Sequence, residues 1–347
     1  MIQVGIVGLG FMGMVHYLSY QRLQGVRVVA ICEQNTKRLA GDWTDIQGNF
    51  GPPGEQMDLS GIATYESSDD LIADSKVDLV DVTLPPATHT DVSLAALRGR
   101  KHVFCEKPMA MTVGDCDRML AVAEEAEKGL LIGHVLPFFP EYSWALREIG
   151  SGEHGRLLGG SFKRVISDPA WLANYWSAEA VGGPMLDLHV HDAHYIRLLF
   201  GMPNGVSSWG RTRDGLAEYW HTLFDYGIEG PVVHAVGGTI NQQGRSFNQG
   251  FEIHLERATL TFEFAVIDGE GVVLCPPTLF REDSTVEQPQ LLGGDPMDAF
   301  AEELSEVVRN IRDEVPETEL DGRLARDAIE LCQKQTRSLH SRSRIVI

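Results

Sequence analysis

Hydrophobic positions near the start of the chain follow two different periods. Residues 2–7 form a short apolar run that is rich in β-branched side chains, and residues 26–33 repeat this pattern. Runs of this kind are typical of buried strands. Between them, residues 10–23 place apolar side chains at helical spacing, without proline and with Gly25 after the end. The pattern therefore predicts a strand, helix, strand unit of about thirty residues.

The same alternation continues through the first 133 residues. Strands are predicted at 77–84 and 101–106, with a helix at 88–99 between them. Alternating strands and helices favour a parallel, doubly wound α/β sheet. Residues 41–63 are rich in glycine and proline at their centre, and we expect a surface excursion there.

The pattern changes after Gly133. Short strand-like segments follow one another, separated by Gly, Asn and Asp turns with little helix, which favours a large, mostly antiparallel open sheet in an α+β domain. Two amphipathic helices are expected near the C-terminus. The predicted domains are 1–133, for a dinucleotide, and 134–347, for substrate binding and oligomerisation. The predicted strands of the second domain lie at 157–167, 205–213, 219–226, 232–240, 251–266 and 271–277.

Composition narrows the class of protein. Hydrophobic residues make up 43% of the 347 positions and the mean hydropathy is -0.11, as expected of a globular protein with sizeable cores. The net charge is -20, from 49 acidic and 29 basic residues. This charge repels phosphate backbones and anionic lipid surfaces, so neither nucleic acid nor a membrane is the expected partner.

Cysteine usage and the N-terminus bear on location. The five cysteines form no C-x-x-C pair, which fits reduced thiols better than a disulfide framework or a zinc ribbon. No basic region followed by an apolar stretch precedes the first strand, and no apolar run is long enough to span a bilayer. We therefore expect a cytoplasmic protein.

The sequence GLGFMG, residues 8–13, lies between the first strand and the first helix. In that setting Gly8 makes the tight turn, Gly10 lets the backbone approach a pyrophosphate, and Gly13 allows close helix packing. Glu33 ends the second strand twenty residues later, where a carboxylate accepts hydrogen bonds from ribose hydroxyls. These features predict a dinucleotide site that includes Phe11 and Met12 of the turn.

The choice of dinucleotide rests on charge. Glu33 would repel a 2′-phosphate, which favours NAD over NADP. Lys37 and Arg38 follow a few residues later and could compensate that repulsion, so NADP stays possible.

A lysine follows the strand at 101–106 directly. Lys107 comes after Glu106 and precedes Pro108, at the sheet edge where open α/β folds bind ligands. An exposed Glu-Lys pair of no functional consequence is the alternative.

The segment GGPMLDLHVHDAH, residues 182–194, contains three histidines. With Pro184 in the first turn of a helix, Asp187 and His191 share one face and His194 continues the stripe. An aspartate and a histidine so paired can transfer a proton. Ordinary helix residues and a metal site made by Asp187, His191 and His194 are the alternatives, and no nearby glutamate or cysteine completes a zinc signature.

Aromatic residues precede this helix. Trp171, Tyr175 and Trp176 offer flat apolar faces for a sugar ring, and Lys163 or Arg164 could bind hydroxyls or a carboxylate. Ordinary packing of a loop explains the three aromatics equally well.

Four motifs in this order resemble those of the Gfo/Idh/MocA oxidoreductases, the glucose-fructose oxidoreductase and inositol dehydrogenase family. They are GLGFMG, TLPPATH at 83–89, GRKHVFCEKP at 99–108 and GGPMLDLHVHDAHYIRLLFG at 182–201. The resemblance covers the first 200 residues. It implies a nicotinamide-dependent oxidoreductase of sugars or polyols, with a Rossmann domain and a second domain built on an open antiparallel sheet.

The resemblance also implies roles for residues. Lys107 would be catalytic, with Asp187 and His191 completing a triad that also contacts substrate. The sheet would mediate a homodimer or homotetramer. His194 stands where the family pattern more often has aspartate, and could contact substrate. The further residues expected to bind cofactor are Thr83, Pro85, His89, Glu106 and Lys107, and those expected to bind substrate are Lys163, Trp171 and Trp176.

Several alternatives remain open. Either His191 or Lys107 could accept the hydroxyl proton. A glycosidase of the same fold that retains its NAD is a second candidate function. A dinucleotide-sensing regulator without catalysis is the third, and the presence of Lys107, Asp187 and His191 speaks against it.

Overall fold

The computed structural model describes residues 1–347 except 171, 173, 293 and 315–317. Contacts within the chain divide it into two compact units. Unit 1 comprises residues 1–139 and 293–326, and unit 2 comprises residues 140–292 and 327–347. The boundary predicted at residue 133 assigned residues 293–326 to the second domain, whereas their contacts assign them to unit 1.

The described part of unit 1 contains a six-stranded sheet in the order β3-β2-β1-β4-β5-β6, with every pair of neighbours parallel. The doubly wound sheet predicted from the sequence is thereby confirmed. The strands are β1 (Ile2–Val7), β2 (Val26–Cys32), β3 (Ala63–Tyr65), β4 (Leu79–Val82), β5 (His102–Glu106) and β6 (Leu130–Gly133).

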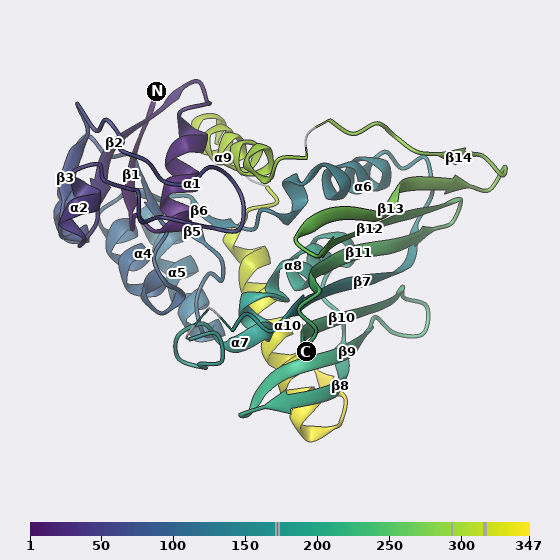
Figure 1. Ribbon diagram of the computed structural model, residues 1–347. Helices are drawn as coiled ribbons and strands as arrows, with labels where there is room; N and C mark the ends of the chain where they lie inside the picture. The colour runs from purple at the N-terminus through teal and green to yellow at the C-terminus, as the bar shows by residue number, and fades with distance from the viewer. Residues whose placement is uncertain (171, 173, 293, 315–317) are drawn as a thin grey trace. The chain divides into compact units, whose positions relative to one another are not determined.

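Helices cover both faces of this sheet (Figure 1). The helix α1 (Phe11–Tyr20) packs against α9 (Pro296–Asp313), and α4 (His89–Arg98) packs against α5 (Val113–Ala126). Right-handed crossovers place α1 and α4 on opposite faces, because β2 and β5 lie on opposite sides of the central pair. The shorter elements are α2 (Thr36–Leu39), α3 (Ser68–Ala73), η1 (Pro86–Thr88) and η2 (Leu136–Phe138).

The segment at 41–63 differs from its prediction. Trp43 is fully buried and Ile46 is 2% exposed, and both belong to the core of unit 1. The Trp43 ring packs edge-on against Tyr17 of α1, and Phe50 stacks on Phe300 of α9. The expectation of a surface excursion is therefore wrong for these side chains, whose burial outweighs the turn-forming composition around them.

In the described part of unit 2, nine strands form one sheet in the order β14-β13-β12-β11-β7-β10-β9-β8-β15. Only the β7 and β10 pair is parallel, so the mostly antiparallel sheet is confirmed. Its strands are β7 (Leu157–Ser167), β8 (Gly205–Arg213), β9 (Leu216–Asp225), β10 (Val232–Ile240), β11 (Arg245–Leu255), β12 (Ala258–Ile267), β13 (Glu270–Arg281), β14 (Val286–Glu287) and β15 (Ile345–Val346).

The helices of unit 2 are α6 (Pro140–Gly150), α7 (Gly183–Asp187), α8 (Val190–Phe200) and the larger part of α10 (Gly322–Ser341). Tyr195 of α8 packs edge-on against Phe162 of β7 and Tyr142 of α6. These rings are buried, and they form the contact between the helices and one face of the sheet. No helix in the described part of the chain is long and apolar enough to cross a bilayer.

Candidate functional site

The glycine-rich turn joins β1 to α1. Gly8 adopts a φ of 103°, which favours glycine. A Cβ on Gly13 would lie 2.0 Å from the Gly8 carbonyl oxygen, so only glycine lets α1 begin this close to the strand. The Thr83 hydroxyl, directly after β4, donates to the Gly8 carbonyl oxygen at 2.7 Å. The turn is thus fixed by two neighbouring strands.

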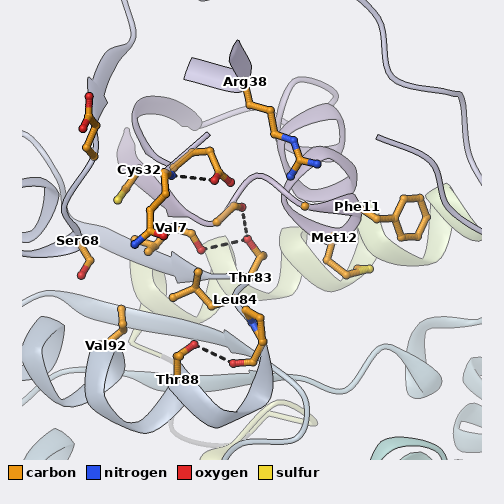
Figure 2. Close-up of a pocket in the computed structure, with 16 residues that line it drawn as sticks. Val7, Phe11, Met12, Cys32, Arg38, Ser68, Thr83, Leu84, Thr88 and Val92 are labelled. Atoms are coloured by element: carbon orange, nitrogen blue, oxygen red, sulfur yellow. Dashed lines mark hydrogen bonds between the residues drawn. The ribbon is translucent and has the colours of Figure 1, made fainter. Parts of the chain in front are cut away.

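A cleft of about 720 Å³ opens at the carboxyl ends of β1, β2 and β4 (Figure 2). Gly10 lines it, and a Cβ added there would meet nothing within 4 Å, so open space faces the first turn of α1, where backbone N–H groups attract phosphate. Seven predicted cofactor residues line the cleft: Gly8, Gly10, Phe11, Met12, Glu33, Thr83 and Pro85. The cleft is also lined by Arg38, which was considered only for NADP, and by residues outside the predicted cofactor set: Val7, Cys32, Gln34, Glu66, Ser68, Leu84, Thr88 and Val92.

The carboxylate of Glu33 is held by backbone N–H groups. Leu9 N donates to Glu33 Oε2 at 2.8 Å, and Gln34 and Asn35 donate to Oε1 at 2.7 and 2.9 Å. These bonds orient an acceptor at the end of β2, where the ribose of a dinucleotide would lie. The glycine turn and this acceptor fit a dinucleotide.

Four predicted cofactor residues do not line this cleft: Gly13, His89, Glu106 and Lys107. Gly13 acts through packing, as above. The His89 ring is fully buried, with its nitrogens 2.8 Å from the Pro108 carbonyl oxygen and 2.7 Å from that of Leu84. Burial lowers the pKa of His89, so the ring is neutral near pH 7 and donates to one of the two oxygens at a time. It joins the segments that follow β4 and β5.

A buried group of ionisable side chains lies behind Glu106, and the sequence patterns did not reveal it. His16 Nδ1 lies 2.9 Å from Asp81 Oδ2, and His16 Nε2 lies 3.2 Å from Glu106 Oε1. Glu303 of α9 is also fully buried there. Burial alone would lower the pKa of His16, but Asp81 and Glu106 outweigh it and raise the pKa well above its usual value. The ring is therefore a cation between two carboxylates.

Glu303 is the neutral member of this group. Burial, and then the negative charge of Glu106, raise the pKa of Glu303 well above its usual value. Above pH ~4.3 the unfolded chain therefore releases a proton that the folded chain keeps, and folding stability falls as the pH rises. The stability that the raised pKa of His16 contributes is complete below pH ~6.5 and falls in the same direction.

We expect Glu303→Gln to remove the pH dependence that Glu303 causes. The free energy of unfolding of the variant should exceed that of the wild type, and the difference should grow from pH 5 to pH 8 by up to about 1.4 kcal/mol per pH unit. Urea unfolding at a series of pH values measures this. Glu302→Gln, at the exposed neighbouring position, is the matched control, and a difference that shrinks with pH would contradict the assignment.

Lys107 follows β5 directly and is half-buried. Its backbone N–H donates to Glu106 Oε2 at 3.0 Å, while Glu106 Oε1 contacts His16. The buried group therefore fixes the backbone from which the lysine side chain extends.

Asp187 and His191 belong to unit 2. The single helix predicted from Pro184 is interrupted, because α7 ends at Asp187 and α8 begins at Val190. The N–H groups of Leu188 and His189 both donate to the Pro184 carbonyl oxygen, at 3.1 and 3.0 Å. Because two N–H groups share one acceptor, the regular helical bonding pattern is broken between α7 and α8. Every residue from 183 to 196 except Asp187 and His191 is buried. The two predicted catalytic residues are thus the two that reach solvent.

The other polar residues of α8 stabilise unit 2. Arg164 of β7 donates to Asp192 Oδ2 at 2.7 Å and to Gln249 Oε1 at 2.8 Å, and all three side chains are buried. His189 contacts Gln335 Oε1 at 3.0 Å. His194 is fully buried as well, which leaves no solvent-facing surface for the predicted contact with substrate. Arg164, one of two candidates for binding substrate, instead joins the sheet to α8.

Lys163 points away from α8. Strand alternation places it on the opposite face of β7 from Arg164, where its ammonium group donates to Glu263 Oε1 at 2.7 Å. It is therefore separated from His191 by the sheet.

Of the aromatic residues before α7, Trp171 lies outside the described residues. Tyr175 is 2% exposed, which fits a packing role. Trp176 is half-buried, donates to Asp168 Oδ1 at 3.0 Å, and has the Arg213 guanidinium 4.4 Å from its ring centre. One ring face is thus occupied by a cation.

Two further features concern possible metal binding and the state of the cysteines. Among the described residues, no group of three or more His, Cys, Asp or Glu side chains is placed to hold a metal ion. All five cysteines are free thiols.

A parallel sheet with a glycine turn and a carboxylate held at the end of its second strand defines a dinucleotide-binding fold in unit 1. A family model described as an oxidoreductase family with an NAD-binding Rossmann fold matches residues 2–134. A second model, the GFO/IDH/MocA C-terminal domain, matches residues 143–261. The chain belongs to the Gfo/Idh/MocA family.

Curated relatives include sugar and polyol enzymes. Inositol 2-dehydrogenase of Salmonella typhimurium is 32% identical over 161 residues, which cover 45% of this chain and 44% of that protein. 1,5-Anhydro-D-fructose reductase of Ensifer adhaerens is 26% identical over 68% of this chain and 74% of its own length. The match thus covers less than half the length of this inositol 2-dehydrogenase.

Solved structures share the fold at low identity. A levoglucosan dehydrogenase in complex with NADH and levoglucosan aligns with a TM-score of 0.79 over 100% of this chain and 99% of its own, at 19% identity. A probable dehydrogenase from Thermotoga maritima aligns with a TM-score of 0.75 at 19% identity, over 99% and 98% of the two chains. These likenesses support the fold.

Proposed function

We propose that the chain is a nicotinamide-dependent oxidoreductase that acts on CH–OH groups of a sugar, a polyol or a related cyclic hydroxy compound. The observation that supports this most strongly is the cleft of unit 1, in which the glycine turn and Glu33 fit a dinucleotide. The family relationship agrees, and the named relatives include enzymes of inositol and anhydrosugars.

NAD is the proposed cofactor. The cleft is lined by two carboxylates, Glu33 and Glu66, and by one guanidinium, that of Arg38. Glu33 offers an acceptor to a ribose 2′-hydroxyl and repels a 2′-phosphate. Bound there, NAD would accept a hydride from the substrate carbon that carries the hydroxyl group.

The catalytic residues are proposed as Lys107, Asp187 and His191. His191 takes the hydroxyl proton, Lys107 stabilises the developing negative charge on oxygen, and Asp187 orients the donor and acceptor groups. Lys107 as the proton acceptor is the alternative. The half-exposure of Asp187 and His191 within a buried segment supports a role for both.

The assembly and location are proposals too. Exposed apolar side chains lie on β9, β10 and β13 of the open sheet, and their burial favours a homodimer or homotetramer; they are Leu223, Val232, Val272, Val273, Leu274 and Phe280. Size-exclusion chromatography with light scattering tests this, and a monomer at micromolar concentration would contradict it. Five free thiols fit a reducing cytoplasm.

The test of the proposed function is the appearance of reduced-nicotinamide absorbance. The purified protein is mixed with NAD or NADP and with each member of a panel of polyols, aldoses and sugar acids. Turnover with one class of hydroxy compound, faster with NAD, is the expected result. Tight NAD binding without turnover across the panel would favour the regulator, and product release from an artificial glycoside without net reduction of NAD would favour the glycosidase.

Gly10→Ala is expected to weaken NADH binding by at least about tenfold without loss of stability. The new methyl group would occupy the open side of the turn, where the pyrophosphate approaches the backbone. Gly114→Ala in α5, where an added Cβ meets only Thr112 Oγ1 at 3.9 Å, is the control. Fluorescence titration measures both, and unchanged affinity in Gly10→Ala would contradict the placement of the pyrophosphate.

A further inference from the structure

Arg38 lines the cleft, and its positive charge is compensated by Asp45, which does not line the cleft. The guanidinium makes a two-point contact with Asp45: Nε donates to Oδ1 at 3.2 Å and Nη2 donates to Oδ2 at 2.9 Å. Parallel bonds of this kind fix a guanidinium in orientation as well as in charge.

The third bond of Arg38 places it beside the ribose acceptor. Its Nη1 donates to the Leu9 carbonyl oxygen at 2.8 Å, while the N–H of the same Leu9 donates to Glu33 Oε2 at 2.8 Å. The carboxylate and the guanidinium thus bracket one residue of the glycine turn. Arg38 is therefore the cation that lies next to the carboxylate proposed to accept from the ribose.

The charges around this point are unfavourable for a 2′-phosphate. Glu33 and Glu66 are the lining carboxylates, Arg38 is the lining cation, and Asp45 faces Arg38 from the loop after α2. A phosphate monoester carries about two negative charges near pH 7. Among the described residues that line the cleft, Arg38 alone carries a positive charge, and Asp45 already compensates that charge.

We propose that Asp45 is a specificity-determining residue for the cofactor: by pairing with Arg38 it withholds the guanidinium from a 2′-phosphate and reinforces the preference for NAD that Glu33 sets. This inference rests on the proposed function, because it assumes that a nicotinamide dinucleotide occupies the cleft. The bonds to Asp45 use two of the five N–H groups of Arg38, and the bond to Leu9 uses a third. Asp45 therefore acts on binding through charge rather than by blocking the site.

The test compares the Kd values of NADH and NADPH by nicotinamide fluorescence, for the wild type, Asp45→Asn and Asp42→Asn. Asp42 bonds to Thr44 rather than to Arg38, so Asp42→Asn makes the same charge change nearby and should leave the ratio of the two Kd values unchanged. In Asp45→Asn the ratio of the NADPH Kd to the NADH Kd should fall about tenfold, and the fall should shrink in high salt because exposed charges are screened.

Arg38→Gln added to Asp45→Asn completes the experiment. The gain in NADPH binding should disappear in the double variant, because its source is the released guanidinium. An unchanged ratio in Asp45→Asn or a gain that survives Arg38→Gln would overturn the inference while leaving the proposed function intact. Wild-type protein that prefers NADPH would overturn both the inference and the proposed choice of NAD, but not the proposed oxidoreductase reaction. Wild-type protein that binds neither dinucleotide would overturn the proposed function and this inference together.

Discussion

Lys107→Ala is expected to lower kcat/KM by about a thousandfold, since a positioned acid or base and a charge that stabilises an alkoxide each contribute effects of about this size. The loss should fall mainly on kcat. The substitution keeps the backbone N–H that Glu106 Oε2 accepts, so the fold should be retained. Steady-state rates with the substrate class found in the panel measure the effect.

Lys76→Ala is the matched control for this variant. Lys76 is an exposed lysine of the same unit, and its replacement should leave kcat/KM unchanged. Thermal unfolding of both variants establishes that they are folded. If folded Lys107→Ala retained more than about a tenth of wild-type kcat/KM, the catalytic assignment would be wrong.

His16→Leu is expected to reduce the free energy of unfolding by about 3–5 kcal/mol, the usual cost of removing one partner from a buried ionic group. The variant would leave Asp81 and Glu106 in the core without the cation that lies 2.9 and 3.2 Å from them. Urea unfolding followed by circular dichroism measures the loss. His254→Leu, which removes an exposed histidine near Glu252, should cost less than about 1 kcal/mol.

A double variant separates the ionic effect from a simple packing effect. In His16→Leu with Asp81→Leu, one of the two unpaired carboxylates is also removed, and part of the lost stability should return. A double variant less stable than His16→Leu alone would show that side-chain volume, rather than charge, governs this part of the core.

The fold was predictable because its signals are local. The apolar run at 2–7 and the helical spacing after Gly10 correspond to β1 and α1, and the run at 26–33 corresponds to β2 with a difference of one residue at its end. Strand segments of the second unit were equally visible at 157–167 and 232–240. Period and turn chemistry act over a few residues, so a sequence displays them directly.

The parts that could not be predicted depend on contacts between distant residues. His16 meets Asp81 and Glu106 across separations of 65 and 90 residues, and no spacing rule connects them. Trp43 lies in a stretch whose glycines and prolines indicate a loop, yet its ring is fully buried in the core of unit 1. Periodicity predicted one helix around Asp187, whereas backbone bonds to Pro184 divide it in two.

The candidate site was predictable only in part. Glu33 and the glycines follow from a strand, turn and helix pattern that fixes where they lie. Arg38 was weighed only as a possible aid to NADP binding, and its partner Asp45 lies in a loop whose path the sequence does not determine. The opposite directions of Lys163 and Arg164 follow from strand alternation, but which face meets α8 depends on the packing of the whole unit.

The most direct test of the central claim is isotope transfer. The protein is incubated with NAD and a polyol or sugar from the active class that carries deuterium on its carbinol carbons, and the nicotinamide product is analysed by mass spectrometry. One deuterium is expected in each NADH formed, because the hydride comes from the carbon that bears the hydroxyl group. Product formation without deuterium in NADH would contradict a dehydrogenase.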